Sequence, residues 1–299
     1  MSTLSYEKGI IYEFNKNNAY TKKVTSGTTL TIETYDCFQN QIQTPETEVE
    51  AIDWDKINPA TGPIYVEDAL PGDVLKVTIE NIDIGDQGVM VVGPELGIMG
   101  DRFDKMESKI LPIKHDKVLF NDLELPINKM IGVIGVAPEG EGVNCGTPGA
   151  HGGNMDNKMV TEGATLYFPV FTEGALFGLG DFHAAMGDGE VSVSGIEVPG
   201  AATVTLEVIK GETLRHPLLE NDEAFTQIVS ADTLDEAAKE ATREMIDRIV
   251  EKSGLPIAEV TMLMSAVGQV EICQIVDPLM TARFVVPKWL LEKLNITLI

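Results

Sequence analysis

Hydrophobic and polar residues alternate with the period of a β-strand through the first two thirds of the chain. Residues 28–34 place Leu30 and Ile32 on one face, and residues 74–80 repeat the pattern after the turn Pro71-Gly72-Asp73. Gly and Pro residues separate such segments at short intervals, which is typical of a β-sandwich or barrel and not of alternating strands and helices. Further strands are expected at 117–120, 130–136, 164–168, 190–196 and 203–209.

The last third changes to a helical pattern. Thr233-Leu-Asp-Glu236 is a capping box, and apolar residues recur behind it at helical spacing until Gly254, a typical helix stop. Pro256 suits the first turn of a second helix that runs towards Ala266. Two further strands, at 271–276 and 282–286, and a short helix from Pro287 complete the expected elements.

These patterns predict a mainly β protein of the α+β class. No internal repeat, low-complexity tract or linker divides the 299 residues. We therefore expect one body spanning residues 1–299, with a β-rich part at about 1–212 and a smaller α/β portion with the C-terminal helices at about 213–299.

The charge balance narrows the range of expected binding partners. The chain has 22 Lys and Arg against 47 Asp and Glu, a formal net charge of −25. Such a surface repels nucleic acid and anionic membranes, so neither is expected as a partner, whereas cations are attracted. The longest apolar runs, such as residues 130–138, are too short to span a bilayer.

Three cysteines, Cys37, Cys145 and Cys273, lie far apart and form no CxxC pair. This usage is typical of reduced thiols rather than a disulfide framework. The N-terminus has neither the basic nor the apolar region of a signal peptide, so a cytoplasmic location is expected.

The densest candidate chemistry lies in the glycine-rich stretch 178–200. In an extended backbone, residues i and i+2 share a face, so Asp181 and His183 project together, and the same spacing relates Asp188 to Glu190. Carboxylate and imidazole groups combined in this way suit a divalent cation. The alternative is an ordinary polar turn between two strands.

Two other stretches offer polar side chains. In residues 144–158, His151 lies between two Gly/Pro turns and Asn154 follows, an arrangement typical of a rigid loop that presents a functional side chain. Asp36 lies where a strand ends. A structural turn with an exposed histidine, and a solvated acid, are the respective alternatives.

Common hydrolase signatures are absent from the sequence. There is no GxSxG elbow, HExxH helix, Gly/Ser-rich serine-amidase stretch or Walker A loop. A Cys145 nucleophile with His151 as its base is the alternative hypothesis, although a spacing of six residues in a rigid loop imposes no contact between them.

Several of these stretches together resemble the acetamidase/formamidase family, in particular its compact bacterial branch of about this length. The resemblance runs from about Thr28 to Pro287. It rests on Glu33-Thr-x-Asp36-x-Phe-x-x-Gln41, Asn58-Pro59-x-Thr-Gly62-Pro63, Pro148-Gly149-x-His151-Gly-Gly-Asn154-x-Asp156, Gly180-Asp181-x-His183-x-x-x-Gly187-Asp188-Gly189-Glu190 and Cys273-Gln-Ile-Val-Asp277-Pro.

The resemblance implies a jelly-roll-like β-sandwich or barrel with a smaller α/β portion. It also implies hydrolysis of formamide or acetamide to the carboxylate and ammonia, with a divalent metal at the active site, zinc by expectation and calcium as the alternative. The expected metal ligands are drawn from Asp36, His151, Asp181 and His183.

Among the expected catalytic residues, Glu190 is the general base and later acid. Asn154 or nearby loop amides stabilise the oxyanion, and His151 and Asp188 complete the set. A non-catalytic, divalent-cation-binding β-sandwich is the alternative function. A homodimer is expected in either case, because edge strands of a sandwich are readily covered across a two-fold axis.

Overall fold

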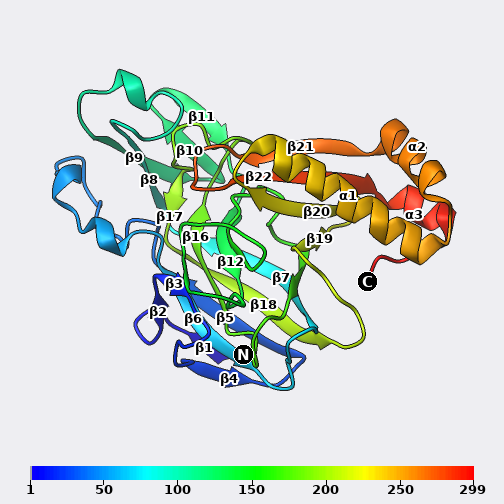
Figure 1. Cartoon of the computed structure of the whole chain (residues 1–299). Helices are drawn as coiled ribbons and strands as arrows, with labels where there is room; N and C mark the ends of the chain where they lie inside the picture. Colours follow the sequence, from blue (N-terminus) through cyan, green and yellow to red (C-terminus); the bar gives the residue numbers. More distant parts are fainter. Residues whose placement is uncertain (1) are drawn as a thin grey trace.

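Two large β-sheets pack face to face in the computed structural model, which describes residues 2–299, and three helices cover one end (Figure 1). The first sheet has nine strands and continues without interruption from the N-terminal strand to the C-terminal ones. Their order is β1 (Ser2–Leu4), β5 (Thr28–Thr34), β18 (Gly200–Ile209), β7 (Val74–Ile84), β15 (Thr165–Pro169), β19 (Leu218–Glu220), β20 (Ala224–Ala231), β22 (Met280–Pro287) and β21 (Gln269–Gln274).

The second sheet carries the polar stretches that the sequence singles out. Its main path is β11 (Leu123–Pro126), β10 (Lys117–Phe120), β9 (Glu107–Lys114), β8 (Gln87–Val92), β17 (Glu197–Val198), β16 (Phe177–His183), β12 (Met130–Gly135) and β14 (Gly152–Asn154). Beside β16 lies β6 (Ala60–Val66), which also pairs with β2 (Ile10–Ile11) and β4 (Lys22–Val24). A separate pair joins β3 (Glu13–Phe14) to β13 (Val143–Asn144), and three short 3₁₀ helices are η1 (Val49–Ala51), η2 (Trp54–Lys56) and η3 (Gly100–Arg102).

The main core lies between the two sheets. Leu30 and Ile32 on β5 are fully buried there, and so are Ile131 on β12 and Phe177 on β16. Fully burying a side chain of this size contributes about 1.5–3 kcal/mol, so this layer holds the sheets together. The mainly β sandwich with a smaller helical portion is confirmed.

The helical part follows its sequence signals closely. Helix α1 (Leu234–Ser253) begins after Thr233, whose hydroxyl accepts a hydrogen bond from the Glu236 N–H at 3.2 Å, and it ends at Gly254 with φ 68°. It lies across β20 and β22 (Figure 1). Helices α2 (Ile257–Val267) and α3 (Lys288–Leu294) complete the layer, and a second core forms beneath them.

One predicted strand is wrong. Residues 190–196 form turns and bends, and only β17, at Glu197 and Val198, pairs with its neighbours. Glu190 and Val193 have left-handed backbones, with φ 45° and 66°, which a strand cannot accommodate. The β-branched residues of this segment favour a strand locally, but the tertiary contacts described below override that preference.

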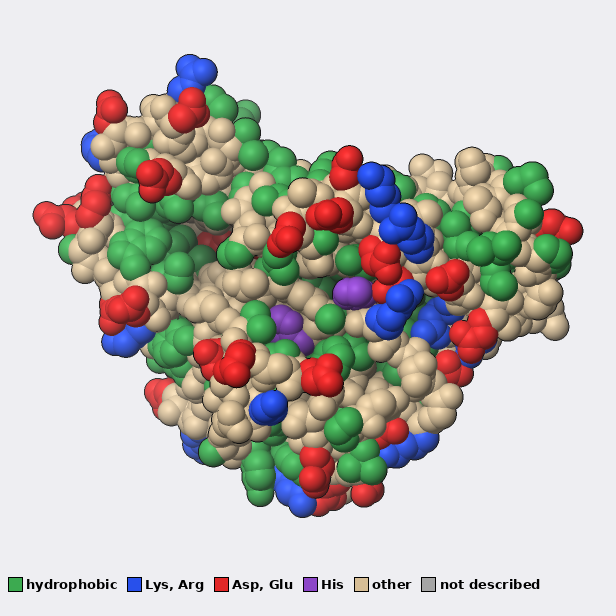
Figure 2. Space-filling model, in the orientation of Figure 1, with side chains coloured by type: hydrophobic (Ala, Val, Ile, Leu, Met, Phe, Trp, Pro, Cys, Tyr) green, Lys and Arg blue, Asp and Glu red, His purple; other side chains and the backbone are tan. Residues whose placement is uncertain are grey.

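The molecular surface carries its acids in a dispersed arrangement. Figure 2 shows Asp and Glu side chains spread over the visible face, with Lys and Arg between them. No helix within residues 2–299 has both the length and the apolar character required to cross a membrane.

Candidate functional site

Strand β16 is the centre of a dense polar cluster. Its last residue, His183, and Asp181 project to the same side, with 3.3 Å between His183 Nε2 and Asp181 Oδ1, as the i, i+2 spacing predicts. Glu197 lies directly opposite His183 in the antiparallel pair of β16 and β17, which brings its Oε2 to 3.2 Å from the same nitrogen. Cross-strand neighbours of this kind are close because of the sheet geometry itself.

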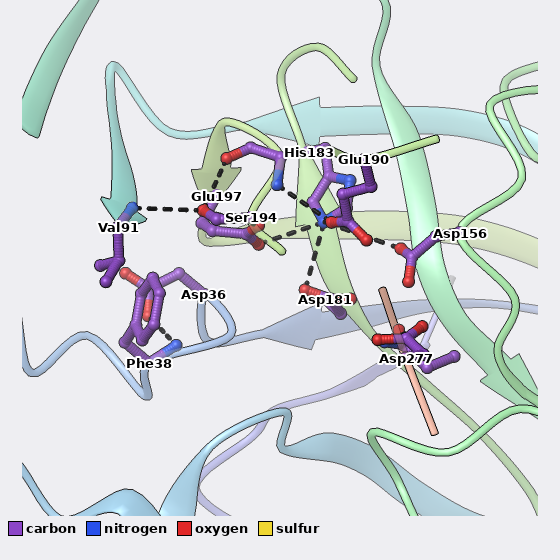
Figure 3. Close-up of polar contacts among 12 residues, drawn as sticks. Asp36, Phe38, Val91, Asp156, Asp181, His183, Glu190, Ser194, Glu197 and Asp277 are labelled. Carbon is purple, nitrogen blue, oxygen red and sulfur yellow. Dashed lines mark hydrogen bonds and ion pairs between the residues drawn. The ribbon is translucent and has the colours of Figure 1, made fainter. Parts of the chain in front are cut away.

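Three more acids complete the cluster from separate loops (Figure 3). Asp156 follows β14 and Glu190 lies in the loop after β16; each places a carboxylate oxygen 3.9 Å from His183 Nε2. Asp277 follows β21, where it accepts a hydrogen bond from the Asn154 side-chain amide at 3.1 Å. The first four acids are buried and Asp277 is half-buried.

The backbone is strained at the acids themselves. Asp156, Asp181 and Glu190 have φ values of 42°, 56° and 45°, in the left-handed region that side chains other than glycine rarely adopt. A left-handed backbone at such a residue costs about 1–3 kcal/mol. It persists only where the surrounding structure fixes it, which is common at functional sites. One such restraint is visible at Glu190, whose Oε1 accepts the Gly195 N–H at 3.0 Å.

Burial and mutual repulsion raise the pKa values of four of these acids. Burial, reinforced by the charge of Asp181, raises the pKa of Asp156 to about 7. Burial, with a contribution from Asp181 and against that of His183, raises the pKa of Glu197 to about 8. Removal from water and the charge of Asp156 raise the pKa values of both Glu190 and Asp277 well above the ordinary range.

The surrounding acids also raise the pKa of the His183 imidazole. Burial alone would lower the pKa of His183, but the charges of Glu197 and Asp181 raise it well above its ordinary value. Burial would likewise raise the pKa of Asp181, yet the positive charge of His183 holds it below the ordinary value. Asp181 and His183 therefore form an ion pair, while the other acids compete for positive charge.

The donor set fits a divalent cation. Both carboxylate oxygens of Asp156, both ring nitrogens of His183 and Oε2 of Glu197 are buried and form no hydrogen bond within residues 2–299. Asp156, His183 and Glu190 each offer a ligand atom within 4.8 Å of the others, and Cys37, Asp181 and Glu197 do the same. Unpaired buried donors of nitrogen and oxygen are costly alone and suit metal coordination.

A pocket of about 390 Å³ opens onto this cluster. Asp181, Glu190, Glu197 and Asp277 line it together with Asn154, so the acids are accessible to a small molecule. The expected polar residues Glu190 and Asn154 therefore both lie at the pocket.

Two expected metal ligands lie outside the cluster. The Asp36 carboxylate accepts the N–H groups of Phe38 and Asn40, at 3.0 and 2.6 Å, within its own turn. His151 is buried beside Phe14, and desolvation lowers its pKa to about 4, so it is neutral. The structure brings Asp181 and His183 together but does not group Asp36 or His151 with them.

Asp188 is held by cations instead of facing Glu190. Both of its oxygens accept hydrogen bonds from the buried Arg283 of β22, at 3.0 and 2.9 Å, and Lys158 lies 2.7 Å from Oδ2. Arg283 also bonds Glu271 and Asn157. Asp188 thus fixes one end of the turn that presents Glu190.

The surroundings of Cys145 disfavour a nucleophile. Its thiol is buried among apolar side chains and donates weakly to the Ile11 carbonyl, and burial raises its pKa far above the usual range. A nucleophilic cysteine requires the opposite shift. Within residues 2–299, no hydrogen bond joins Cys145 to His151.

Sequence reasoning assigned no role to three members of the cluster: Asp156, Glu197 and Asp277. Asp156 and Asp277 stand inside the motifs that carry the family resemblance, and that was the available signal. Glu197 directly follows the strand expected at 190–196, and its pairing with His183 is what identifies it.

Comparisons with known proteins agree on one family. A model of the Acetamidase/Formamidase family matches residues 14–145 and 139–291. A solved structure described as a predicted acetamidase/formamidase from Thermoanaerobacter tengcongensis is 48% identical, with a TM-score of 0.97 over 99% of this chain and 98% of that one. An acetamidase from Bacillus halodurans is 44% identical, with a TM-score of 0.96 over 98% of this chain and 100% of that one.

A further relative matches a shorter segment of the chain. An acetamidase of Mycolicibacterium smegmatis is 40% identical over 72 residues, which are 24% of this chain and 18% of that protein. The match therefore spans less than a fifth of that relative's length.

Gly132 on β12 provides a test of the cluster's geometry. A Cβ added there would collide with Asp156 Oδ1 and Asp181 Oδ2. We expect added Zn²⁺ to raise the melting temperature of the unmodified protein. We expect Gly132→Ala to displace both carboxylates, to destabilise the fold by about 1–3 kcal/mol through overpacking, and to abolish that response to Zn²⁺. Gly140→Ala is the control, since no atom lies within 4 Å of its added Cβ. Wild-type stability and an unchanged response to Zn²⁺ in Gly132→Ala would contradict this account.

Proposed function

The chain belongs to the acetamidase/formamidase family, and we propose that it hydrolyses a small aliphatic amide of the formamide or acetamide type to the carboxylate and ammonia. The family model covers most of the chain. The observation that carries the proposal is the cluster of acids around His183 at an accessible pocket.

Amide hydrolysis needs a group that moves protons, because an amide is a poor electrophile and its nitrogen leaves only when protonated. We assign this role to Glu190. Burial and the charge of Asp156 raise its pKa well above the ordinary value, so it holds a proton at a higher pH than an exposed glutamate does. The Gly195 N–H fixes one carboxylate oxygen, which leaves the other for water and for the departing nitrogen.

Asn154 is our choice for contact with the substrate oxygen. Its side-chain amide has two N–H groups, of which one is donated to Asp277. The second remains to stabilise negative charge on the carbonyl oxygen, a contribution of about 2.7–4 kcal/mol in other hydrolases. Asp277 thereby acts as the group that orients Asn154.

We further propose that a divalent cation, zinc with calcium as the alternative, is held by the unpaired donors of Asp156, His183 and Glu197 together with the neighbouring carboxylate of Asp181. When bound, such an ion polarises a carbonyl and makes water more acidic. This set replaces Asp36, whose carboxylate is already bonded within its turn, and His151, which lies beside Phe14.

A non-catalytic cation-binding protein is the alternative, and the family match does not favour it. Release of ammonia from formamide or acetamide separates the two functions. We also propose a cytoplasmic location, since Cys37, Cys145 and Cys273 are all free thiols.

Glu190→Gln tests the assignment of proton transfer. The substitution keeps the size of the side chain but removes its ability to accept a proton, so we expect kcat to fall by about 10²–10⁴-fold. Folding, measured by circular dichroism, is expected to be unchanged. Glu124→Gln, at an exposed position on β11, is the control. A Glu190→Gln variant with wild-type kcat would refute the assignment, and one that loses its metal would identify Glu190 as a ligand.

Removal of the cation tests the proposed metal. Dialysis against a chelator is expected to abolish ammonia release and to lower the melting temperature, because the buried acids then repel one another without compensation. Zn²⁺ or another divalent ion is expected to restore both. Full activity in protein that elemental analysis finds free of metal would exclude metal assistance.

A homodimer is our proposal for the assembly. Strand β21 is an edge of the nine-stranded sheet and exposes Val270 and Ile272, the type of surface that a second copy covers. We expect sedimentation at micromolar concentration to give twice the 32.4 kDa chain mass. Val270→Lys with Ile272→Lys is expected to give the single-chain mass, whereas Leu123→Lys on β11 leaves the dimer intact. A single-chain mass for the unmodified protein would contradict the proposal.

A further inference from the structure

The pocket above the acids has an apolar wall built from three separate segments. Phe38 comes from the turn after β5, and Trp54 and Ile57 come from η2 and the residue that follows it. Val91 and Leu96 come from β8 and the turn after it. These side chains belong to a small apolar cluster separate from the main core. Figure 2 shows hydrophobic side chains gathered beside a hollow at the left of this face.

The lining of this pocket combines acids, apolar side chains and the uncharged polar residues Asn58, Asn144, Thr147, Asn154 and Ser194. The charged lining residues are Asp181, Glu190, Glu197 and Asp277, all members of the cluster around His183. No Lys or Arg of residues 2–299 lines the pocket, so an acyl group with its own carboxylate would have no counter-ion. A bound amide that places its carbonyl at the acids therefore directs its other end to an uncharged wall.

The size of the pocket exceeds what the smallest amides fill. Its volume of about 390 Å³ lies within the range of about 300–1,000 Å³ that holds drug-sized ligands. Formamide has no carbon beyond its amide and acetamide has a single methyl group. Neither amide fills a space of this volume.

From these observations we infer that the preferred substrates are primary amides with an uncharged, apolar acyl chain of several carbons, and that Trp54, Ile57 and Leu96 form the wall that selects them. The inference rests on the proposed amide hydrolysis and specifies its substrate class. Each methylene transferred from water to an apolar wall favours binding about fourfold. Remote contacts of this kind raise kcat/KM.

The test is a series of unbranched primary amides, namely formamide, acetamide, propionamide, butyramide and hexanamide, assayed by ammonia release with the metal-loaded protein. We expect kcat/KM to rise by about fourfold per methylene up to the length at which the chain reaches the wall. A flat or falling series beyond acetamide overturns the inference and leaves the proposed function standing. Failure to hydrolyse any amide in the series, formamide and acetamide included, refutes the proposed function and the inference with it.

Two variants assign the preference to the wall. Trp54→Ala is expected to reduce the hexanamide-to-acetamide ratio of kcat/KM by on the order of tenfold, since the long chain loses its contact surface. Trp289→Ala removes the other tryptophan of the chain, which is exposed on α3, and is expected to keep the ratio. Leu96→Ser provides a second change in the wall if Trp54→Ala does not fold. An unchanged ratio in a folded wall variant contradicts the assignment.

Discussion

Repulsion among carboxylates held away from water is the constraint on which this structure depends. Asp156, Asp181, Glu190 and Glu197 are buried around a single imidazole, and Asp277 lies beside them. Burying several like charges is costly, so the cluster must take up protons, rely on His183 or bind a cation. The left-handed backbones at three of these acids add to the cost. A fold that tolerates both the buried charges and the strained backbones has to hold the acids rigidly, and the two stacked sheets do so.

The support reaches the cluster from parts of the chain that are far apart in sequence. Strand β16 lies in the middle of its sheet, between β17 and β12, and its end carries the ion pair of Asp181 and His183. Gln274, fully buried, accepts the N–H groups of Val276 and Asp277 and so fixes the turn of the half-buried acid. Because each acid is held by its own segment, the cluster forms only when both sheets are assembled.

The sequence predicts those features that depend on local spacing. The capping box at Thr233 defines the start of α1, and the i, i+2 relation of Asp181 and His183 gives the central ion pair. The sequence alone cannot predict contacts that depend on how strands pair. Glu197 therefore does not stand out as a site residue until its pairing with His183 is known. The expected strand at 190–196 is wrong because a hydrogen bond from the Gly195 backbone N–H to the Glu190 carboxylate and two residues with left-handed backbones outweigh β propensity. Asp36 and His151 are expected ligands by their motifs, and local spacing does not reveal that the Asp36 carboxylate accepts hydrogen bonds within its own turn or that His151 packs beside Phe14.

The hydrogen bonds between Arg283 and Asp188 have a consequence for how this protein could have evolved. Arg283 and Asp277 both come from beyond residue 212, whereas Asp188 and Asn154, to which they bond, come from before it. An exchange of the C-terminal segment with that of a distant relative would separate a buried guanidinium from its carboxylate and an amide from its acceptor. Substitutions at one end of either contact are therefore expected to depend on the residue at the other end.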